Sequence, residues 1–321
     1  MLMPMVDPLP IFSALGDATR LRILALLRRM ELSVGELAQV LGQSQPRVSR
    51  HVKILCDAGL AERRKEGSWV FVALGSAEVV APIAAALDGW AHGQADHWAV
   101  ADIARLAAVR ADRAAAATAW FETHAGEWDA IRSLHVAEAQ VEAAMAEVLG
   151  PAPIGTLIDI GTGTGRMLEL FAGRADAALG IDRSSEMLRL ARAKLAGSAN
   201  TELRQADLYA LPMTDGAADL AIIHHVLHFA AAPGAAIAEA ARVLAPGGRL
   251  LIVDFAPHDR EELRARDAHV RLGFADAQIE GWAEAAGLRM MRVETLGGGE
   301  LTVKLWLARK GAAGLHEVKA A

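Results

Sequence analysis

Residues 156–166 read Thr-Leu-Ile-Asp-Ile-Gly-Thr-Gly-Thr-Gly-Arg, a short apolar run that passes directly into a glycine-rich loop. The apolar run predicts a buried β-strand, and the sequence after the loop predicts a helix. Glycine at such a junction lets backbone amides approach a ligand closely, because no Cβ stands in the way. The stretch therefore predicts a nucleotide-type α/β fold with a ligand at this loop.

Strands and helices alternate over the rest of the C-terminal half. Two final strands are expected on either side of the glycine turn at 297–299, which predicts an antiparallel edge on a mostly parallel sheet. The predicted class is a Rossmann-like sheet with an antiparallel edge strand. Its central strands are expected to end at Ile160, Asp182, Asp207, His225 and Asp254.

Two common ligands of glycine-rich loops are disfavoured by the residues present. The dinucleotide fingerprint needs a third glycine where Arg166 stands, and no Gly-Lys-Ser/Thr triplet marks a loop that binds nucleoside triphosphates. Three acids remain, namely Asp159 before the loop, Asp182 after the second strand and Asp207 after the third. Asp182 lies 21 positions after Gly161, about where an acid that accepts ribose hydroxyls belongs.

This combination resembles the class I S-adenosylmethionine-dependent methyltransferases that carry Asp-x-Gly-x-Gly-x-Gly, over about residues 120–310. The resemblance implies that the loop packs against the methionine part of the cofactor. It implies that the second-strand acid takes the ribose hydroxyls, and that the third-strand acid with its neighbour holds the adenine. The Trp-rich segment 120–132 is interpreted either as core packing or as a lid over the cofactor. The expected cofactor-binding residues are Asp159, Gly161, Gly163, Gly165, Asp182, Arg183, Asp207, Leu208, His224, Trp128 and Arg132.

Three histidines, His224, His225 and His228, follow the fourth predicted strand. His224 and His228 could share a helical face, as zinc ligands do, but no acid or thiol is expected to complete such a set. The histidines are interpreted as structural groups or as the lining of a methyl-transfer pocket, where His224 or His225 could act as a catalytic base. No metal cofactor is predicted.

The N-terminal segment predicts two short helices joined by a tight turn and followed by a basic hairpin. Ser33 begins the first helix and Gly42 ends it, while Ser44 begins the second. The second helix sets an apolar face against a polar and basic one, as a recognition helix in a DNA major groove requires. The expected DNA-binding residues are Gln45, Arg47, Ser49, Arg50 and Lys53 on this helix, with Arg63, Arg64 and Lys65 on the hairpin.

Residues 9–75 resemble the ArsR-type winged-helix repressors, most clearly in the run Ser-Gln-Pro-Arg-Val-Ser-Arg-His at 44–51. The resemblance implies a homodimer that binds an inverted repeat in double-stranded DNA. Arsenic-sensing members carry Cys-x-Cys where this chain has Ser33 and Gly35, and neither residue binds a soft metal ion. The single cysteine, Cys56, is interpreted as a small buried hydrophobe. We therefore expect no response of operator binding to arsenite or zinc.

The composition limits the remaining possibilities. With 321 residues, 53% of them hydrophobic, the chain can form two packed domains. The net charge of −6 excludes a globally basic surface, although residues 1–90 carry 10 Lys and Arg against 9 Asp and Glu. One cysteine and the lack of a long apolar run or a basic leader predict a cytoplasmic protein with no membrane span.

The expected organisation is a winged helix-turn-helix domain at 1–90, a helical linker and lid at 91–150, and a methyltransferase domain at 151–321. The expected function is a transcriptional regulator fused to an enzyme. The enzyme would transfer a methyl group from S-adenosylmethionine to a small-molecule acceptor and leave S-adenosylhomocysteine. The alternative is a non-catalytic repressor that senses either form of the cofactor. A nucleic-acid methyltransferase is disfavoured by the acidity of the catalytic half.

Overall fold

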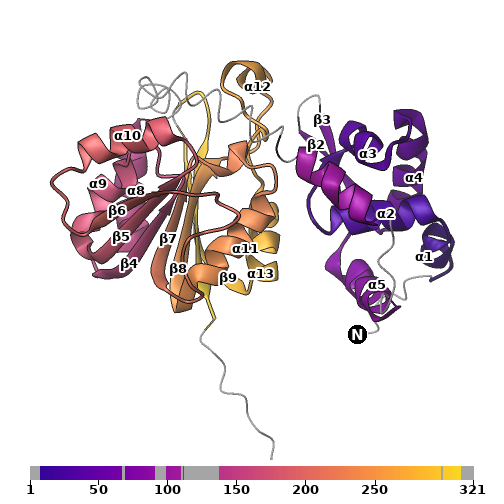
Figure 1. Cartoon of the computed structure of the whole chain (residues 1–321), viewed down its shortest axis with the longest axis horizontal. Helices are drawn as coiled ribbons and strands as arrows, with labels where there is room; N and C mark the ends of the chain where they lie inside the picture. The colour runs from indigo at the N-terminus through magenta and orange to yellow at the C-terminus, as the bar shows by residue number, and fades with distance from the viewer. Residues whose placement is uncertain are drawn as a thin grey trace, which may run out of the picture. The chain divides into compact units, whose positions relative to one another are not determined.

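The computed structural model describes residues 8–66, 69–90, 99–109, 111, 137–297 and 299–311. The chain divides into two compact units, Met1–Ala114 and Ala115–Ala321, and each is described by itself (Figure 1). Segment 120–132, with Trp128 and Arg132, lies outside the described residues. Among the described helices, none is long and apolar enough to cross a membrane.

The first unit combines short helices with a small antiparallel sheet whose strand order is β1-β3-β2. The strands are β1 (Leu32–Ser33), β2 (Ala61–Glu66) and β3 (Trp69–Leu74). The labelled helices are α1 (Pro8–Leu15), α2 (Ala18–Leu27), α3 (Val34–Leu41), α4 (Gln45–Asp57) and α5 (Ala77–Trp90). The helix-turn-helix and the hairpin predicted from the sequence are thus both present.

Local capping explains where these helices begin and end. The Asp17 side chain accepts the Arg20 amide at the start of α2. Ser33, the predicted start of this helix, forms a capping box with Glu36, and Gly42 ends α3 in the left-handed conformation, with φ of +64°. Ser44 stands at the N-cap of α4 as expected, but no capping hydrogen bond from its side chain is seen among the described residues.

The helix at 99–109 also belongs to the first unit. Its Asp102 is buried and accepts two hydrogen bonds of 2.7 Å from the Arg22 guanidinium of α2. Leu106 and Val109 are buried as well. This part of the segment predicted as a linker therefore packs into the unit that carries the helix-turn-helix.

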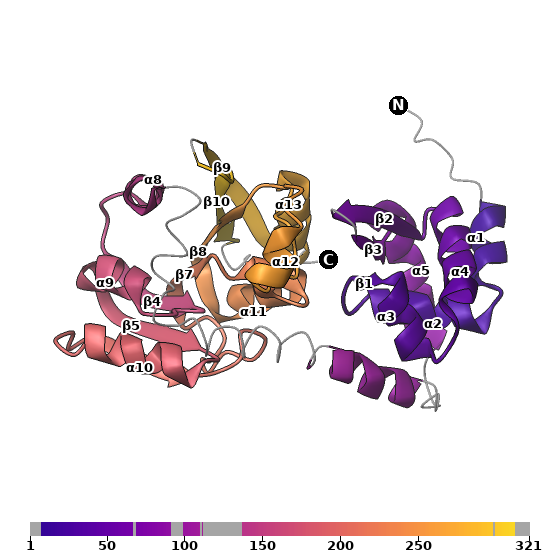
Figure 2. The same ribbon diagram turned by 90° about the horizontal axis from the view of Figure 1, so that it is seen from above.

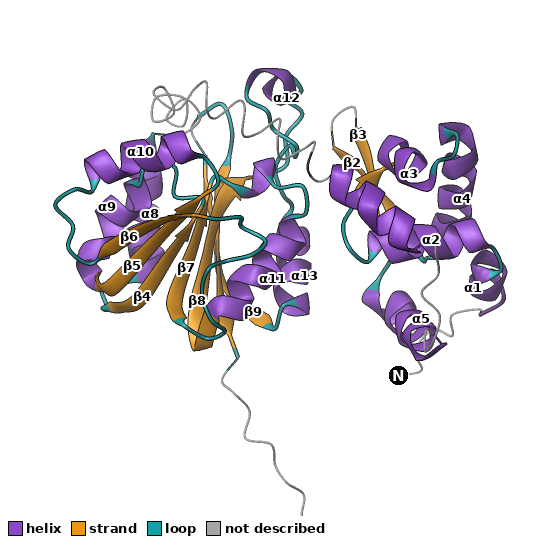
Figure 3. Cartoon of the chain, viewed as in Figure 1, coloured by secondary structure: helices purple, strands orange, loops and turns teal. Residues whose placement is uncertain are grey.

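The second unit is built on a seven-stranded sheet with the order β6-β5-β4-β7-β8-β10-β9, within the residues described (Figure 3). The pairs among β6, β5, β4, β7 and β8 are parallel, and β10 is antiparallel to both β8 and β9. The predicted parallel sheet with an antiparallel edge is confirmed. The strands are β4 (Ile154–Ile160), β5 (Ala175–Asp182), β6 (Thr201–Gln205), β7 (Ala218–His224), β8 (Leu244–Phe255), β9 (Leu288–Leu296) and β10 (Val303–Lys310).

Helices cover both faces of this sheet (Figure 2). Helices α8 (Glu138–Leu149) and α9 (Arg166–Phe171) pack on one face, and α11 (Pro233–Val243) and α13 (Asp276–Ala285) pack on the other. Helix α10 (Ser185–Lys194) lies against β5 and β6. Both faces are covered, which explains why the parallel strands are continuous apolar runs. The short helices are η2 (Ala172–Arg174), η3 (Leu227–Phe229) and α12 (Glu262–Arg266).

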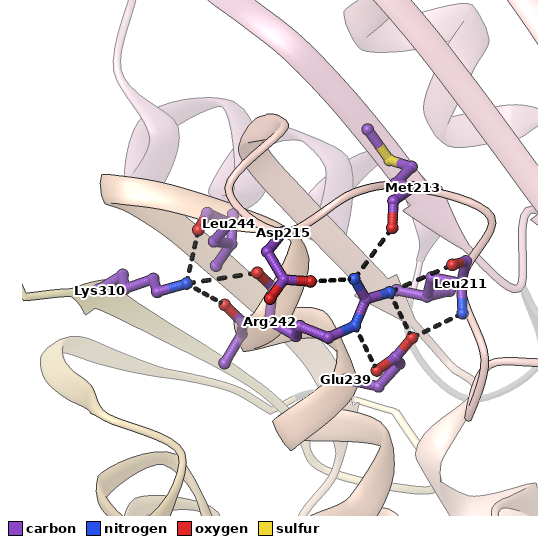
Figure 4. Close-up of polar contacts among 8 residues, drawn as sticks. Leu211, Met213, Asp215, Glu239, Arg242, Leu244 and Lys310 are labelled. Carbon is purple, nitrogen blue, oxygen red and sulfur yellow. Dashed lines mark hydrogen bonds and ion pairs between the residues drawn. The ribbon is translucent and has the colours of Figure 1, made fainter.

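A polar network holds the edge of the sheet where β8 begins, opposite the glycine-rich loop (Figure 4). The Arg242 guanidinium donates to the carboxylates of Glu239 and Asp215, and to the carbonyl oxygens of Leu211 and Met213. Hydrogen bonds to Glu239 and Asp215 raise the pKa of Arg242. Lys310 donates to the carbonyl oxygens at the end of α11, where a cation offsets the helix dipole. This edge is therefore fixed by internal pairing.

Candidate functional site

The loop at 161–165 joins β4 to α9 and depends on its glycines. Gly161, Gly163 and Gly165 adopt φ values of +75°, +52° and +85°, which other residues rarely adopt. A Cβ at Gly161 would lie 2.5 Å from a methyl carbon of Val226, and one at Gly165 would lie 2.9 Å from a methyl carbon of Leu195. The loop is thus a close-packed turn at the carboxyl edge of the sheet.

Asp182 ends β5 and fastens this loop. Its Oδ2 accepts the Gly163 amide at 2.9 Å, and its Oδ1 accepts the Ser184 amide at 2.8 Å. Burial raises the pKa of Asp182, and the amide hydrogen bonds oppose that shift. The Arg183 amide also hydrogen-bonds the carboxylate, which has about four acceptor positions in all. Asp182 therefore keeps capacity to accept a hydroxyl group of a ligand bound at the loop.

Asp207 and Arg183 meet beside it, at the ends of β6 and β5. Their closest charged atoms, Arg183 Nη1 and Asp207 Oδ2, are 4.0 Å apart. Asp207 also accepts the Tyr209 amide at 2.9 Å, while Leu208 packs half-buried against the core. A carboxylate next to an apolar side chain can take the amino group and the ring of a purine.

Asp159 stands apart from this group. It lies in β4, two residues before the loop, and is 1% exposed. The structure therefore places its carboxylate in the interior of the sheet rather than on the surface of the site.

His224, His225 and His228 are all buried at the carboxyl end of β7. Strand β7 ends at His224, one residue earlier than predicted, because His225 adopts a left-handed φ of +54° that breaks the extended backbone. The rings of His224 and His225 lie 4.6 Å apart between centroids. Val226, which follows, is the residue packed against Gly161, so these histidines are close to the glycine-rich loop in the fold.

An acid does accompany these histidines, and the expectation that none would was wrong. His228 Nδ1 lies 2.7 Å from Oδ1 of Asp254, a fully buried residue near the end of β8. Burial raises the pKa of Asp254 to about 6. Parallel pairing of β7 with β8 places His224 opposite Val253. Asp254, the next residue of β8, therefore lies beside the end of β7. The sequence signal was available, because Asp254 ends a predicted strand as Asp182 does.

Sequence reasoning also missed two further imidazoles and a buried cation. The segment after β8 folds back, and its Val270 and Arg271 amides both donate to the carbonyl oxygen of His228 at 2.9 Å. This places the His269 ring 4.2 Å from that of His228, with His258 beyond it. Arg271 is fully buried here. These residues come from an irregular segment with no periodic pattern to predict its path.

The recognition helix α4 presents the expected surface. Its Val48, Val52 and Leu55 are fully buried, which orients the helix. Lys53 forms an ion pair of 2.7 Å with Asp57 one turn later. The exposed predicted residues are Gln45, Arg47, Arg50 and Lys53, and Ser49 is half-buried.

The predicted basic residues of the hairpin differ in exposure and in pairing. Arg63 and Lys65 are exposed, and Arg63 donates to the carbonyl oxygen of Ser49 on α4 at 3.3 Å. Arg64 instead donates to the carboxylates of Glu31 and Glu62. The charge of Arg64 is therefore neutralised within the unit.

A hollow of about 740 Å³ lies between this hairpin and the helices, and Ser33 and Gly35 line it. The Ser33 hydroxyl accepts the Glu36 amide of the capping box. Cys56 is half-buried rather than buried, and desolvation raises the pKa of its thiol. Of the two positions that carry thiolates in arsenic sensors, Ser33 caps α3 here and Gly35 offers no side-chain ligand.

Comparison with known proteins supports the same division of the chain. Residues 17–63 match the bacterial regulatory protein arsR family, and residues 158–252 match a methyltransferase domain family. An uncharacterized HTH-type transcriptional regulator of Methanocaldococcus jannaschii is 45% identical over 62 residues, which are 19% of this chain and 70% of that protein. Demethylmenaquinone methyltransferase of Thermus thermophilus is 40% identical over 105 residues, which are 32% of this chain and 47% of the relative.

The second unit has a counterpart among solved structures. A chain in the complex between the Haloferax volcanii Trm112 methyltransferase activator and a methyltransferase shares its fold, with a TM-score of 0.51 and 19% identity. The match covers 60% of this chain and 97% of that one. The chain spans about half or less of the length of the first curated relatives that it matches. With both families matched in separate segments, this chain belongs to the arsR-type regulators and joins that domain to a class I methyltransferase domain.

Proposed function

We propose that this protein is a DNA-binding regulator whose second unit binds S-adenosylmethionine and transfers its methyl group to a small-molecule acceptor. The observation that carries the proposal is Asp182. Its Oδ2 accepts the amide of Gly163 in the glycine-rich loop, and its Oδ1 accepts the amide of Ser184. Both contacts lie within the segment that matches the methyltransferase domain family. A carboxylate fixed in this way is prepared for the hydroxyls of a ribose.

The residues around the loop fit this cofactor. The backbone of the glycine-rich loop would pack against the methionine part, and Asp207 with Leu208 suits the adenine. The bound cofactor supplies an electrophilic methyl group on a sulfonium. The chain's own residues would align donor and acceptor and exclude water, which is the main catalytic requirement of this reaction. His224 and His225 are the proposed groups for an acceptor that must lose a proton.

The first unit supplies the DNA-binding part of the proposal. Arg47, Arg50 and Lys53 lie exposed on α4, and Arg63 and Lys65 extend the basic surface along the hairpin. These groups suit base edges and phosphates of a major groove and its flanks. We propose a homodimer on an inverted repeat, acting in the cytoplasm. Within the segment predicted as linker and lid, Trp128 and Arg132 would close over the cofactor.

A second candidate is a regulator that senses the cofactor without catalysis. It is favoured by Ser33 and Gly35, because the arsR-type domain lacks the thiolates with which arsenic sensors detect metal. The signal that controls DNA binding would then come from the second unit. A cofactor can shift DNA affinity only by its different affinity for the DNA-competent and DNA-incompetent states.

One experiment tests the proposal and separates the candidates. Operator affinity is measured without cofactor, with S-adenosylmethionine and with S-adenosylhomocysteine. Formation of S-adenosylhomocysteine is followed in parallel with a small-molecule extract of cells as the acceptor source. Turnover supports the enzyme, and a cofactor-dependent affinity without turnover supports the sensor. Failure to bind either form of the cofactor would overturn both.

A further inference from the structure

We propose that His225, His228 and Asp254 form a binding site for one divalent transition metal ion, of the zinc or iron(II) class. One donor atom from each of the three residues lies within 4.8 Å of the other two. All three residues are buried. The site lies at the carboxyl ends of β7 and β8, beside the cofactor loop. It shares His225 with the groups proposed for proton removal, and with the ion bound that role would fall to His224.

The local fold arranges these side chains as a metal site requires. His225 and His228 are three positions apart across the short helix η3, so the chain turns between them. Asp254 comes from the neighbouring strand. Its Oδ1 also accepts the Phe255 amide at 2.8 Å, and its Oδ2 accepts the His228 amide at 3.2 Å. These bonds fix the carboxylate before any ion arrives.

The backbone at His225 supports the assignment. A φ of +54° is unfavourable for a residue with a Cβ, and the His225 amide is held to the Val253 carbonyl oxygen at 2.8 Å. Strain of this kind persists where the surrounding structure fixes it, and it is concentrated at functional sites. The left-handed turn at His225 lies between the ends of β7 and β8, close to the other two proposed ligands, His228 and Asp254.

The chemistry of the donors selects the class of ion. Two imidazoles and one carboxylate suit zinc, iron(II) and related ions. Magnesium and calcium prefer sets of oxygen ligands, and arsenite prefers thiolates. Burying the Asp254 carboxylate is unfavourable without a compensating positive charge, which a bound dication would provide.

The rings around the three ligands resemble the surroundings of a metal site. Among the ligands, His228 Nδ1 and Asp254 Oδ1 lie 2.7 Å apart, so one ion could contact both atoms. His269 packs on His228 at 4.2 Å, and Phe255 lies 4.8 Å from His225 between ring centroids. Such a shell restricts water and stabilises ring orientation.

The test uses the full chain without an affinity tag, stripped of metal by a chelator. Zinc is titrated in competition with a chromophoric chelator, and cobalt(II) is titrated while its visible absorption is recorded. We expect one equivalent of either ion per chain and a cobalt spectrum typical of nitrogen and oxygen ligands. His228→Asn should weaken zinc binding by about 100-fold, and His258→Asn, in the same cluster but outside the ligand set, should change it less than about threefold.

Two results would overturn the site. One is the lack of saturable metal binding or of a cobalt spectrum in the unmodified protein, which requires no variant to fold. The other is equal zinc affinity in His228→Asn and the unmodified chain, which would assign binding to histidines elsewhere. Circular dichroism checks that the variants fold, and His225→Asn replaces a variant that does not. Cofactor binding, measured separately by calorimetry, shows whether the proposed methyltransferase site stands independently of this result.

Discussion

The predicted recognition helix α4 and the carboxyl edge of the second unit's sheet are the two proposed sites, and they are built in opposite ways. Helix α4 is one continuous segment whose charged groups are exposed and whose apolar groups are buried. The carboxyl edge collects buried acids and histidines from several strand ends and from the segment after β8. The first therefore depends on local periodicity, and the second depends on how strands pair.

This difference explains how the two sites should respond to substitution. An exposed arginine contributes one contact among several to a partner and little to the fold. The Asp182 carboxylate, by contrast, holds two backbone amides of the fold as well as the ligand proposed there. We therefore expect losses at the sheet edge to be larger than losses at the helix.

The largest effect is expected from Asp182→Ala. The change removes the acceptor proposed for both ribose hydroxyls, and hydrogen bonds to a charged group contribute about 1.5–3 kcal/mol each. Affinity for S-adenosylmethionine should fall by about 100-fold or more, as measured by isothermal titration calorimetry.

Asp176→Ala is the matched control, because Asp176 lies exposed on the same strand β5. It should leave cofactor affinity unchanged. Normal cofactor binding by Asp182→Ala, with a native circular dichroism spectrum, would show that the cofactor site has been placed wrongly.

A smaller loss is expected at the recognition helix. Arg50→Ala should weaken operator binding by about 1–3 kcal/mol if the side chain reads a base, or reduce the salt slope by about one if it holds a phosphate. Arg64→Ala should do less, because Arg64 is already paired with Glu31 and Glu62. Gel-shift titrations at several salt concentrations distinguish the two variants, and an equal effect from both would refute the division of the hairpin charges.

The same contrast decides what could be predicted from the sequence. The strands, the capping box at Ser33 and the polar face of α4 follow from local patterns, and the structure has them. The acid beside His228 was missed, because it lies 26 positions away and only the pairing of β7 with β8 brings it near. The pairing of Arg64 was missed for the same reason, since Glu31 lies on the other side of the helix-turn-helix in the sequence.

A third change tests the opposite edge of the sheet, where pairing serves only the fold. Arg242→Ala removes ion pairs with Glu239 and Asp215 and leaves the Leu211 and Met213 carbonyl oxygens without this donor. Since Arg242 is about one-third exposed, solvent screens part of the effect. We expect a loss of about 1–2 kcal/mol, or a fall in Tm of roughly 2–6 °C for a unit of this size.

Arg189→Ala is its control. Arg189 forms a comparable pair with Glu186 on α10, but on the exposed surface. Its Tm should stay within error of the unmodified chain, because exposed ion pairs contribute little. Differential scanning calorimetry measures both variants. A larger fall for Arg189→Ala than for Arg242→Ala would show that the network at Arg242 does not stabilise the sheet.

No change in operator affinity is expected when arsenite is added to the operator complex. Arsenite needs several thiolates, and the corresponding positions hold Ser33, whose hydroxyl caps α3, and Gly35. Cys56 is a single half-buried thiol, and its raised pKa keeps it protonated at neutral pH. Operator affinity should be the same with and without arsenite in the unmodified chain and in Cys56→Ala. If arsenite releases DNA stoichiometrically from the unmodified chain but not from Cys56→Ala, the arsenite sensor lies in the first unit. A regulatory signal from the second unit would then no longer be needed.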